Sequence, residues 1–380
     1  MLTTAVACAD EPWLRHTIDA SSQGADGVRL ADVNGDNLMD IATGWEEGGI
    51  VRAYLHPSRG NERAKWPAVT VGKVKSPEDA VFADLDGDGG IDVISACEGN
   101  TRSLFVHWAP KEFLNSDRWK TDAFPVAGPR QSWMYTLPMQ IDGVYGIDLM
   151  VGSKGDRASV GWLQSPANAC DISAWRYHRL EDAGWIMSLI AADMDGDGDD
   201  DVLISDRKGA GRGIYWLERP ASPAESRWPR HDIGGSDHEI LFIAHGDLDQ
   251  DGQLDVAASA KEKLMWFRRT EDTWKPHEIP LPSGVGTGKS VAICDVNADG
   301  KNDLVFSCEN ARGELSGMRW MSWEASPITG PWSNHEIAGS HGIKFDRVVP
   351  HDIDGDGDLD MICCEERANL GVIWYENPAK

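Results

Sequence analysis

The chain has 380 residues and a formal net charge of −26, because 62 aspartate and glutamate residues oppose 36 lysine and arginine residues. Such an acidic surface repels phosphate groups, which excludes nucleic acid as a partner. Seven cysteines are few for a disulfide scaffold, and their odd number leaves at least one thiol free. No apolar run is long enough to span a membrane, so we expect no transmembrane segment.

The first residues differ from the rest of the chain. Residues 1–9 resemble the tail of a secretory signal that ends in Ala-x-Ala, although no basic stretch precedes it. We therefore treat residues 1–9 as a signal-peptide remnant and residues 10–380 as one domain. The remnant favours a periplasmic or extracellular protein, where calcium is abundant enough to fill weak sites.

An Asp-rich motif, Asp-x-(Asp/Asn)-x-Asp-x-x-x-Asp, then recurs six times at intervals near 50 residues. Oxygen ligands at alternate positions of a tight loop suit a hard cation of flexible coordination, so we expect calcium in up to six loops. The ligands expected at positions one, three, five and nine of the loops are Asp32, Asn34, Asp36 and Asp40; Asp84, Asp86, Asp88 and Asp92; Asp193, Asp195, Asp197 and Asp201; Asp247, Asp249, Asp251 and Asp255; Asp295, Asn297, Asp299 and Asp303; and Asp352, Asp354, Asp356 and Asp360.

These loops are not EF-hands. An EF-hand needs flanking helices and a Glu at position twelve, which here holds residues such as Thr43 or Ser95. A short apolar run such as Asp92-Val93-Ile94 follows each loop instead, and it predicts a strand. A seventh copy, from Gln140 to Asp148, has lost most of its acidic residues, and we expect it to bind no metal.

Tryptophan marks two further strands of each repeat. The first series is Tyr54, Trp108, Trp162, Trp216, Trp266, Trp320 and Trp374, and the second is Trp66, Trp119, Trp175, Trp228, Trp274 and Trp332. Each unit therefore reads as a four-stranded antiparallel sheet of the size used for propeller blades. The predicted fold is all-β, a seven-bladed β-propeller in which the N-terminal strand Trp13–Ile18 completes the last blade and leaves no open edge.

The loops and tryptophans resemble those of the FG-GAP/VCBS family of calcium-loop propellers, which includes integrin α-subunit heads and some fungal lectins. Segments such as residues 371–378 are also similar to propellers of bacterial polysaccharide-degrading systems and of fungal aldos-2-ulose dehydratase. The resemblance implies the fold but not one function, because propellers of this kind serve adhesion, sugar binding and catalysis.

Charge segregates at the ring face opposite the Asp loops. The residues six before each loop are Asp26, Glu78, Met134, Met187, Leu241, Lys289 and Asp346, and those six after it are Glu46, Glu98, Lys154, Arg207, Lys261, Glu309 and Glu366. Both series predict an acidic arc on adjacent blades that faces a basic and apolar arc. Clustered carboxylates repel one another unless they are neutralised, so Asp26, Glu78, Asp346 and Glu366 are candidates for a further divalent cation. The alternative is that these are solvated strand ends.

Two classes of function fit this pattern. The first is a metal-assisted lyase or dehydratase on an acidic oligo- or polysaccharide, with Glu98 and Asp346 in the catalytic site and Lys289 or His238 as the base. Its substrate would lie on Trp133, Tyr135 and Trp185, and its anionic groups on Lys154, Arg207 and Lys261. The second is a non-catalytic propeller, either lectin-like or adhesive toward protein. We expect a monomer in both cases. Five histidines next to the blade tryptophans, His16, His178, His231, His277 and His335, are expected to be structural.

Overall fold

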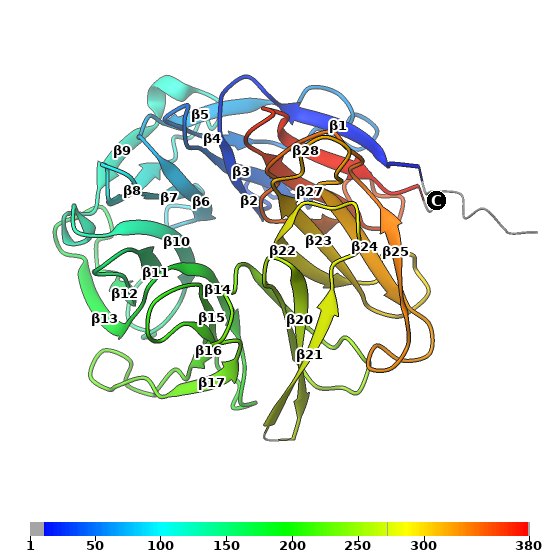
Figure 1. Cartoon of the computed structure of the whole chain (residues 1–380). Helices are drawn as coiled ribbons and strands as arrows, with labels where there is room; N and C mark the ends of the chain where they lie inside the picture. The colour runs from blue at the N-terminus through cyan, green and yellow to red at the C-terminus, as the bar shows by residue number, and fades with distance from the viewer. Residues whose placement is uncertain (1–10, 272, 379–380) are drawn as a thin grey trace, which may run out of the picture.

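A computed structural model describes residues 11–271 and 273–378 as seven four-stranded antiparallel sheets arranged in a ring (Figure 1). The seven-bladed β-propeller is therefore confirmed. Within these ranges the helical elements are two short 3₁₀ turns, η1 (Ser116–Arg118) and η2 (Pro125–Ala127). None of the described helices is long and apolar enough to cross a membrane. The proposed signal-peptide remnant, residues 1–9, lies outside the described residues.

The blades follow one another along the chain, each with its inner strand first. Their strands are β2 (Ala25–Ala31), β3 (Asp40–Trp45), β4 (Ile50–Tyr54) and β5 (Ala68–Gly72) in blade one; β6 (Pro77–Ala83), β7 (Asp92–Cys97), β8 (Ser103–Trp108) and β9 (Lys120–Ala123) in blade two; β10 (Ser132–Met139), β11 (Asp148–Lys154), β12 (Ser159–Gln164) and β13 (Arg176–Asp182) in blade three; β14 (Ile186–Ala192), β15 (Asp201–Asp206), β16 (Gly213–Leu217) and β17 (Arg230–Gly234) in blade four; β18 (Ile243–Gly246), β19 (Asp255–Ser259), β20 (Lys263–Thr270) and β21 (Thr273–Pro280) in blade five; β22 (Thr287–Cys294), β23 (Asp303–Glu309), β24 (Met318–Trp323) and β25 (Trp332–Glu336) in blade six; and β26 (Val349–His351), β27 (Asp360–Glu365), β28 (Gly371–Glu376) and β1 (Leu14–Asp19) in blade seven.

The inner strands line the central channel. Neighbouring inner strands contact one another around the ring, as β2 with β6 and β10 with β14. Every Asp loop joins an inner strand to the second strand of its blade, so the seven loops share one end of the ring. The first residues of the inner strands and the last residues of the second strands therefore meet at the opposite end.

The N-terminal strand closes the ring as predicted. β1 pairs antiparallel with β28, with Leu14 opposite Glu376 and Thr17 opposite Ile373. Figure 1 shows β1 in blue beside β28 in red. The fourth strand of the last blade thus comes from the start of the chain, and closure covers the edges that an open array would expose.

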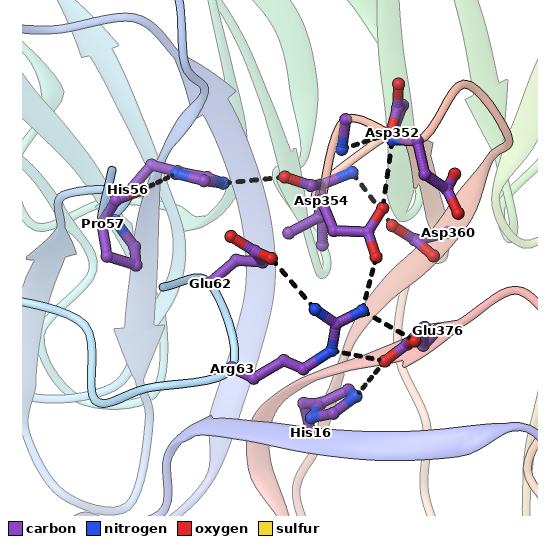
Figure 2. Close-up of polar contacts among 12 residues, drawn as sticks. His16, His56, Pro57, Glu62, Arg63, Asp352, Asp354, Asp360 and Glu376 are labelled. Carbon is purple, nitrogen blue, oxygen red and sulfur yellow. Dashed lines mark hydrogen bonds and ion pairs between the residues drawn. The ribbon is translucent and has the colours of Figure 1, made fainter. Parts of the chain in front are cut away.

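A polar network reinforces this closure (Figure 2). The guanidinium of Arg63 in blade one donates to Asp354 Oδ2 at 2.7 Å and to both carboxylate oxygens of Glu376 at 2.7 and 2.9 Å. It also contacts the buried Glu62 at 3.1 Å. His16 Nε2 lies 2.6 Å from Glu376, so the network joins blade one, the last Asp loop and the closing strand.

Tryptophans of the third strand build the interior of each blade. In five blades a histidine of the fourth strand stacks on this ring, with centroid distances from 3.9 Å for Trp320 and His335 to 4.8 Å for Trp266 and His277. The structural role expected for these histidines is confirmed. Hydrophobic clusters then span neighbouring blades, as where Trp162 of blade three packs in one cluster with Ile204 of blade four.

The second tryptophan series lies slightly earlier than expected. Four of these residues precede the outer strand, and each indole N–H donates to a backbone oxygen of the loop before it, as Trp66 to Glu62 O at 2.9 Å and Trp175 to Ala169 O at 2.9 Å. A buried indole needs such a partner for its N–H. These tryptophans therefore anchor the connection before the outer strand rather than its middle.

Candidate functional site

The position-nine aspartates of the Asp loops are required by the fold itself. Asp40 is fully buried and accepts hydrogen bonds from the backbone N–H of Val33 at 2.9 Å and of His56 at 2.7 Å. Asp148 of the degenerate loop accepts the same pair, from Ile141 and Ser165, at 3.0 and 2.7 Å. This carboxylate holds the loop to the blade whether or not the loop binds a metal.

The remaining loop carboxylates fit a hard cation in several blades. In blade two, Asp84, Asp86 and Asp92 each offer an oxygen within 4.8 Å of the others, and the carboxylates of Asp193, Asp195 and Asp197 converge in the same way in blade four. An all-oxygen donor set of this kind is the one that calcium prefers. The residues of these loops would hold the ion directly and would tie the loop to one conformation.

In the degenerate third loop, the first position holds the amide of Gln140 in place of an aspartate, and this amide donates hydrogen bonds within the loop. Gln140 Nε2 donates to the carbonyl oxygens of Tyr145 and Gly146 at 2.9 and 2.8 Å, and Gln140 Oε1 accepts from Gly143 N at 2.9 Å. The side-chain amide therefore binds the position-seven carbonyl internally. Gln164 further donates to Asp142 at 2.6 Å.

A cavity of about 210 Å³ lies in the channel at the end away from the Asp loops. Carboxylates from blades one, two and seven form one side of its wall, and side chains of Met134, Trp185, Met187 and Phe242 form the other. The charged residues around it are Asp26, Arg29, Glu46, Glu78, Asp79, Glu98, Lys154, Lys289, Lys344, Asp346 and Arg347. Most of the residues that lie six positions before the Asp loops, which were predicted from the sequence to lie at this end of the ring, thus line the cavity.

Side chains that cross the channel form the floor of the cavity. Arg347, just before the inner strand of blade seven, donates to the hydroxyl of Tyr135 in blade three at 2.7 Å. The guanidinium of Arg29 in blade one stacks on the same ring at 3.9 Å and pairs with Asp79 at 2.8 and 2.9 Å. Blades three and seven are as far apart as a ring of seven allows, so these contacts bridge the full channel.

Asp26 and Asp346 form a buried pair of acids next to two lysines. Burial, followed by the charges of Asp346 and Glu366, raises the pKa of Asp26 well above its usual range. Burial opposes ionisation of Asp346 too, but Lys289, 3.6 Å away, lowers the pKa of Asp346 overall. The same pairing outweighs burial at Lys289 and raises its pKa, so Lys289 remains an ammonium group. Lys344 Nζ pairs with Glu366.

Glu78 and Glu98 form a second pair, held by Lys154. Burial raises the pKa of Glu78 to about 8, although the nearby charge of Lys154 works against this effect. Burial also acts on Glu98, but hydrogen bonds from Lys154 and Glu78 outweigh it and lower the pKa of Glu98. Lys154 Nζ contacts Glu98 and lies 3.5 Å from Glu78. The two environments therefore push the pKa values of the two carboxyl groups apart, that of Glu78 upward and that of Glu98 downward.

Several expected site residues lie away from the cavity. Trp133 is 2% exposed and packs in the core between blades two and three, where its indole N–H donates to Ala127 O at 2.6 Å. His238 faces Glu278 on the outer strand of blade five, 3.7 Å away. Arg207 and Lys261 both pair with Glu239, at 3.0 and 2.7 Å.

Trp185 lines the cavity, but cations cover its ring. Lys154, Arg207 and Lys208 lie over the indole at 4.6, 4.6 and 4.7 Å from its centroid. These three cations compete with a sugar for the ring, so Trp185 lines the cavity without serving as a free stacking surface.

Sequence reasoning missed Arg29, Asp79, Lys344, Arg347 and Phe242, all of which line the cavity. Lys344 and Arg347 flank the predicted Asp346, and Asp79 follows the predicted Glu78. A bulge in β6, where the register shifts between Pro77 and Asp79, turns both Glu78 and Asp79 toward the channel. Regular alternation along a strand predicts that neighbouring residues face opposite sides, so it could not predict that both Glu78 and Asp79 face the channel.

Comparison with known proteins agrees with this architecture. Residues 247–306 match the family model described as FG-GAP-like repeat. No curated protein matches the chain. The matched segment runs from the fifth Asp loop into blade six, and the ring repeats its pattern in every blade. The fold and loops define a β-propeller, and one segment of it, residues 247–306, is similar to the FG-GAP-like repeat.

Proposed function

We propose that the channel cavity acts on a single acidic sugar unit by an acid–base elimination, as a lyase or dehydratase does. The observation that carries this proposal is the pair of carboxyl groups of Glu78 and Glu98 in the cavity wall, which share Lys154 as a partner and whose pKa values are shifted in opposite directions. Two titratable groups whose pKa values are pushed apart are the usual arrangement of an acid and a base.

The two groups suit the two proton transfers of an elimination. Glu98, kept ionised by Lys154, takes the proton from the carbon next to the sugar carboxylate. The electron pair of that C–H bond forms the new C=C bond while the C–O bond on the next carbon breaks. Glu78 donates its proton to the departing oxygen, so that neither fragment leaves as an alkoxide.

Positive groups in the wall suit a substrate that carries a carboxylate. Lys289 and Lys344 enter the cavity beside Asp346, and Arg29 and Arg347 lie at its floor. Because Lys289 stays protonated, it stabilises negative charge rather than removing a proton. The base role that the sequence suggested for Lys289 therefore passes to Glu98 in this proposal.

The size of the cavity limits the substrate. Its volume of about 210 Å³ is below the roughly 300–1,000 Å³ of sites for larger ligands. The channel is bridged at the floor, so one terminal unit of an acidic oligosaccharide fits better than the middle of a chain. The apolar side, with Met134 and Met187, would cover the less polar face of the ring.

A divalent cation would add to this chemistry by polarising the substrate carboxylate. Asp26, Asp346 and Glu366 each offer an oxygen within 4.8 Å of the others, and all three residues are buried. Among the described residues none donates a hydrogen bond to Glu366 Oε1, whereas Asp346 Oδ1 lies 3.6 Å from Lys289 Nζ, an ammonium group that a bound cation would have to displace. Calcium in the Asp loops, by contrast, is proposed to be structural.

The proposal is tested by assaying the calcium-loaded protein on acidic and neutral oligosaccharides for new reducing ends and for ultraviolet absorbance from a conjugated double bond. Both signals should rise together on acidic substrates, and one product unit should be released per event. Reducing ends alone would mean hydrolysis and would overturn the elimination. Silence in both signals, with one ligand bound per chain, would make the cavity a lectin-like site.

A further inference from the structure

The fifth Asp loop differs from the other acidic loops in what its carboxylates contact. Asp247, Asp249, Asp251 and Asp255 give it the full calcium pattern. The guanidinium of Arg268, however, reaches into the loop from β20: Nη2 lies 2.6 Å from Asp251 Oδ2, and Nε pairs with Asp249 Oδ2. One arginine thus bridges positions three and five, which are both expected calcium ligands.

Asp247, Asp249 and Asp251 each offer an oxygen within 4.8 Å of the others, as in blades two and four, so it is the guanidinium and not the spacing of the carboxylates that sets this loop apart. Asp251 Oδ1 already accepts Gln253 N at 2.9 Å, so both oxygens of Asp251 are engaged. Asp247 accepts the backbone N–H groups of Asp251 and Gly252 at 3.0 and 2.8 Å, but Asp84 of blade two likewise accepts two backbone N–H groups, so these bonds do not distinguish the fifth loop. Asp249 Oδ1 is the buried oxygen that accepts no hydrogen bond. A divalent cation bound there would lie beside a guanidinium of the same sign, and the two would repel each other.

The residue of blade three that is equivalent to Arg268 also donates a hydrogen bond to its own Asp loop. It lies two residues after the third-strand Trp266, and the equivalent residue of blade three is Gln164, which donates to Asp142 at 2.6 Å. Both residues supply a donor to position three of their own loop.

The other five blades have no such donor in their own loop. Pro110, Glu218 and Glu376 cannot donate from their side chains, Ser322 bonds to His335, and the ring of His56 bonds to the oxygens of Pro57 and Ile353. Arg219, Lys301 and Arg63 approach loops four, six and seven, but each contacts one loop carboxylate, at 3.0, 3.6 and 2.7 Å. Among the described residues, Arg268 alone bridges two.

We infer that Arg268 takes the place of calcium in the fifth loop, so that at most five of the six loops with the acidic pattern bind a calcium ion. This inference is independent of the chemistry proposed for the channel cavity.

The experiment counts calcium bound per chain after dialysis and compares the same loop position in two blades. Asp197 and Asp251 both stand at position five. Asp197→Asn should lower the count by one, whereas Asp251→Asn should leave it unchanged. Arg268→Gln should raise the count by one. Its matched control is Arg269→Gln, which removes the same charge from a side chain that lies over Trp274 instead, and this control should change nothing.

Loss of one ion in Asp251→Asn would show that calcium binds beside the guanidinium, through Asp249 Oδ1, and would overturn the inference. A folded Arg268→Gln variant that binds no more calcium than wild type would overturn it as well. If Arg268→Gln does not fold, the two aspartate variants decide the question.

Discussion

Arg347 Nη1 donates a 2.7 Å hydrogen bond to the hydroxyl of Tyr135, and these two residues come from blades on opposite sides of the ring. The same phenol ring carries the guanidinium of Arg29 on its face at 3.9 Å. A small number of side chains therefore divides the channel into an Asp-loop end and a cavity end. This separation places the cavity residues apart from the loops that would bind calcium.

Removing the Tyr135 hydroxyl should destabilise the protein. Tyr135→Phe keeps the ring under Arg29 but leaves the half-buried guanidinium of Arg347 without its acceptor, which should cost about 1.5–3 kcal/mol of unfolding free energy. Chemical denaturation measures the change. Tyr145→Phe is the matched control, because Tyr145 is 54% exposed, and it should stay within about 0.5 kcal/mol of wild type. Equal stability of both variants would show that the floor contact contributes nothing.

A buried histidine in blade two should make the folding stability of the protein decrease at acidic pH. His107 lies between the hydroxyls of Ser95 and Thr121 at 3.0 and 2.9 Å, and burial lowers its pKa from 6.5 to about 3. The unfolded chain takes up a proton below about pH 6.5 while the folded chain does not, so this stability is present above that pH and is lost as the pH falls toward 3.

His107→Phe tests this directly. The variant should be less stable than wild type at neutral pH by about 1–3 kcal/mol, because the buried hydroxyl of Ser95 loses its partner. The difference should shrink between about pH 6.5 and 4, as wild type alone loses the histidine contribution. His341→Gln, at an exposed position, should track wild type throughout. A constant difference between His107→Phe and wild type would contradict the prediction.

Arg63→Met should loosen the closure of the ring. The change removes the cation shared by Glu62, Asp354 and Glu376, of which Glu62 and Asp354 are 2% and 7% exposed. Because Arg63 itself is 46% exposed, we expect a modest loss of about 1–3 kcal/mol in calcium-free buffer. Calcium should reduce this loss if the last loop binds it, because the ion would neutralise Asp354.

Arg118→Met provides the comparison for this variant, since Arg118 is exposed in η1. Thermal unfolding of the three proteins with and without calcium checks the prediction. A loss for Arg63→Met no greater than that for Arg118→Met would mean that the network in Figure 2 does not reinforce closure.

Sequence periodicity was sufficient to predict the fold. The Asp loops and the third-strand tryptophans recur in register, so they indicated the blade count, the inner strands and the closing strand β1. Positions counted from the loops also placed Asp26, Glu78, Lys289 and Asp346 in the cavity wall, because every blade presents the same inner-strand position to the channel.

Counting positions from the Asp loops could not predict which side chains pair with one another. The sequence assigned Lys154 to an anionic ligand, whereas its amine turns to Glu78 and Glu98 of the neighbouring blade. Arg207 and Lys261 likewise meet Glu239, a residue outside both sequence series. Trp133 was predicted to stack on a sugar because it is aromatic and lies at the start of an inner strand, but its side chain is buried in the core. Long side chains form ion pairs with residues of neighbouring blades, and the spacing of the repeats does not predict which residues pair.

The most direct test of the proposed chemistry is the rate of conjugated double-bond formation on an acidic oligosaccharide, measured across pH for wild type, Glu78→Gln and the exposed Glu225→Gln. We predict that the wild-type rate falls as the pH rises through about 8, where Glu78 loses its proton, and that Glu78→Gln is slower by about 100-fold or more while remaining folded. Glu225→Gln should match wild type. A Glu78→Gln rate equal to wild type at every pH would contradict the assignment of the cavity as the site of acid–base chemistry.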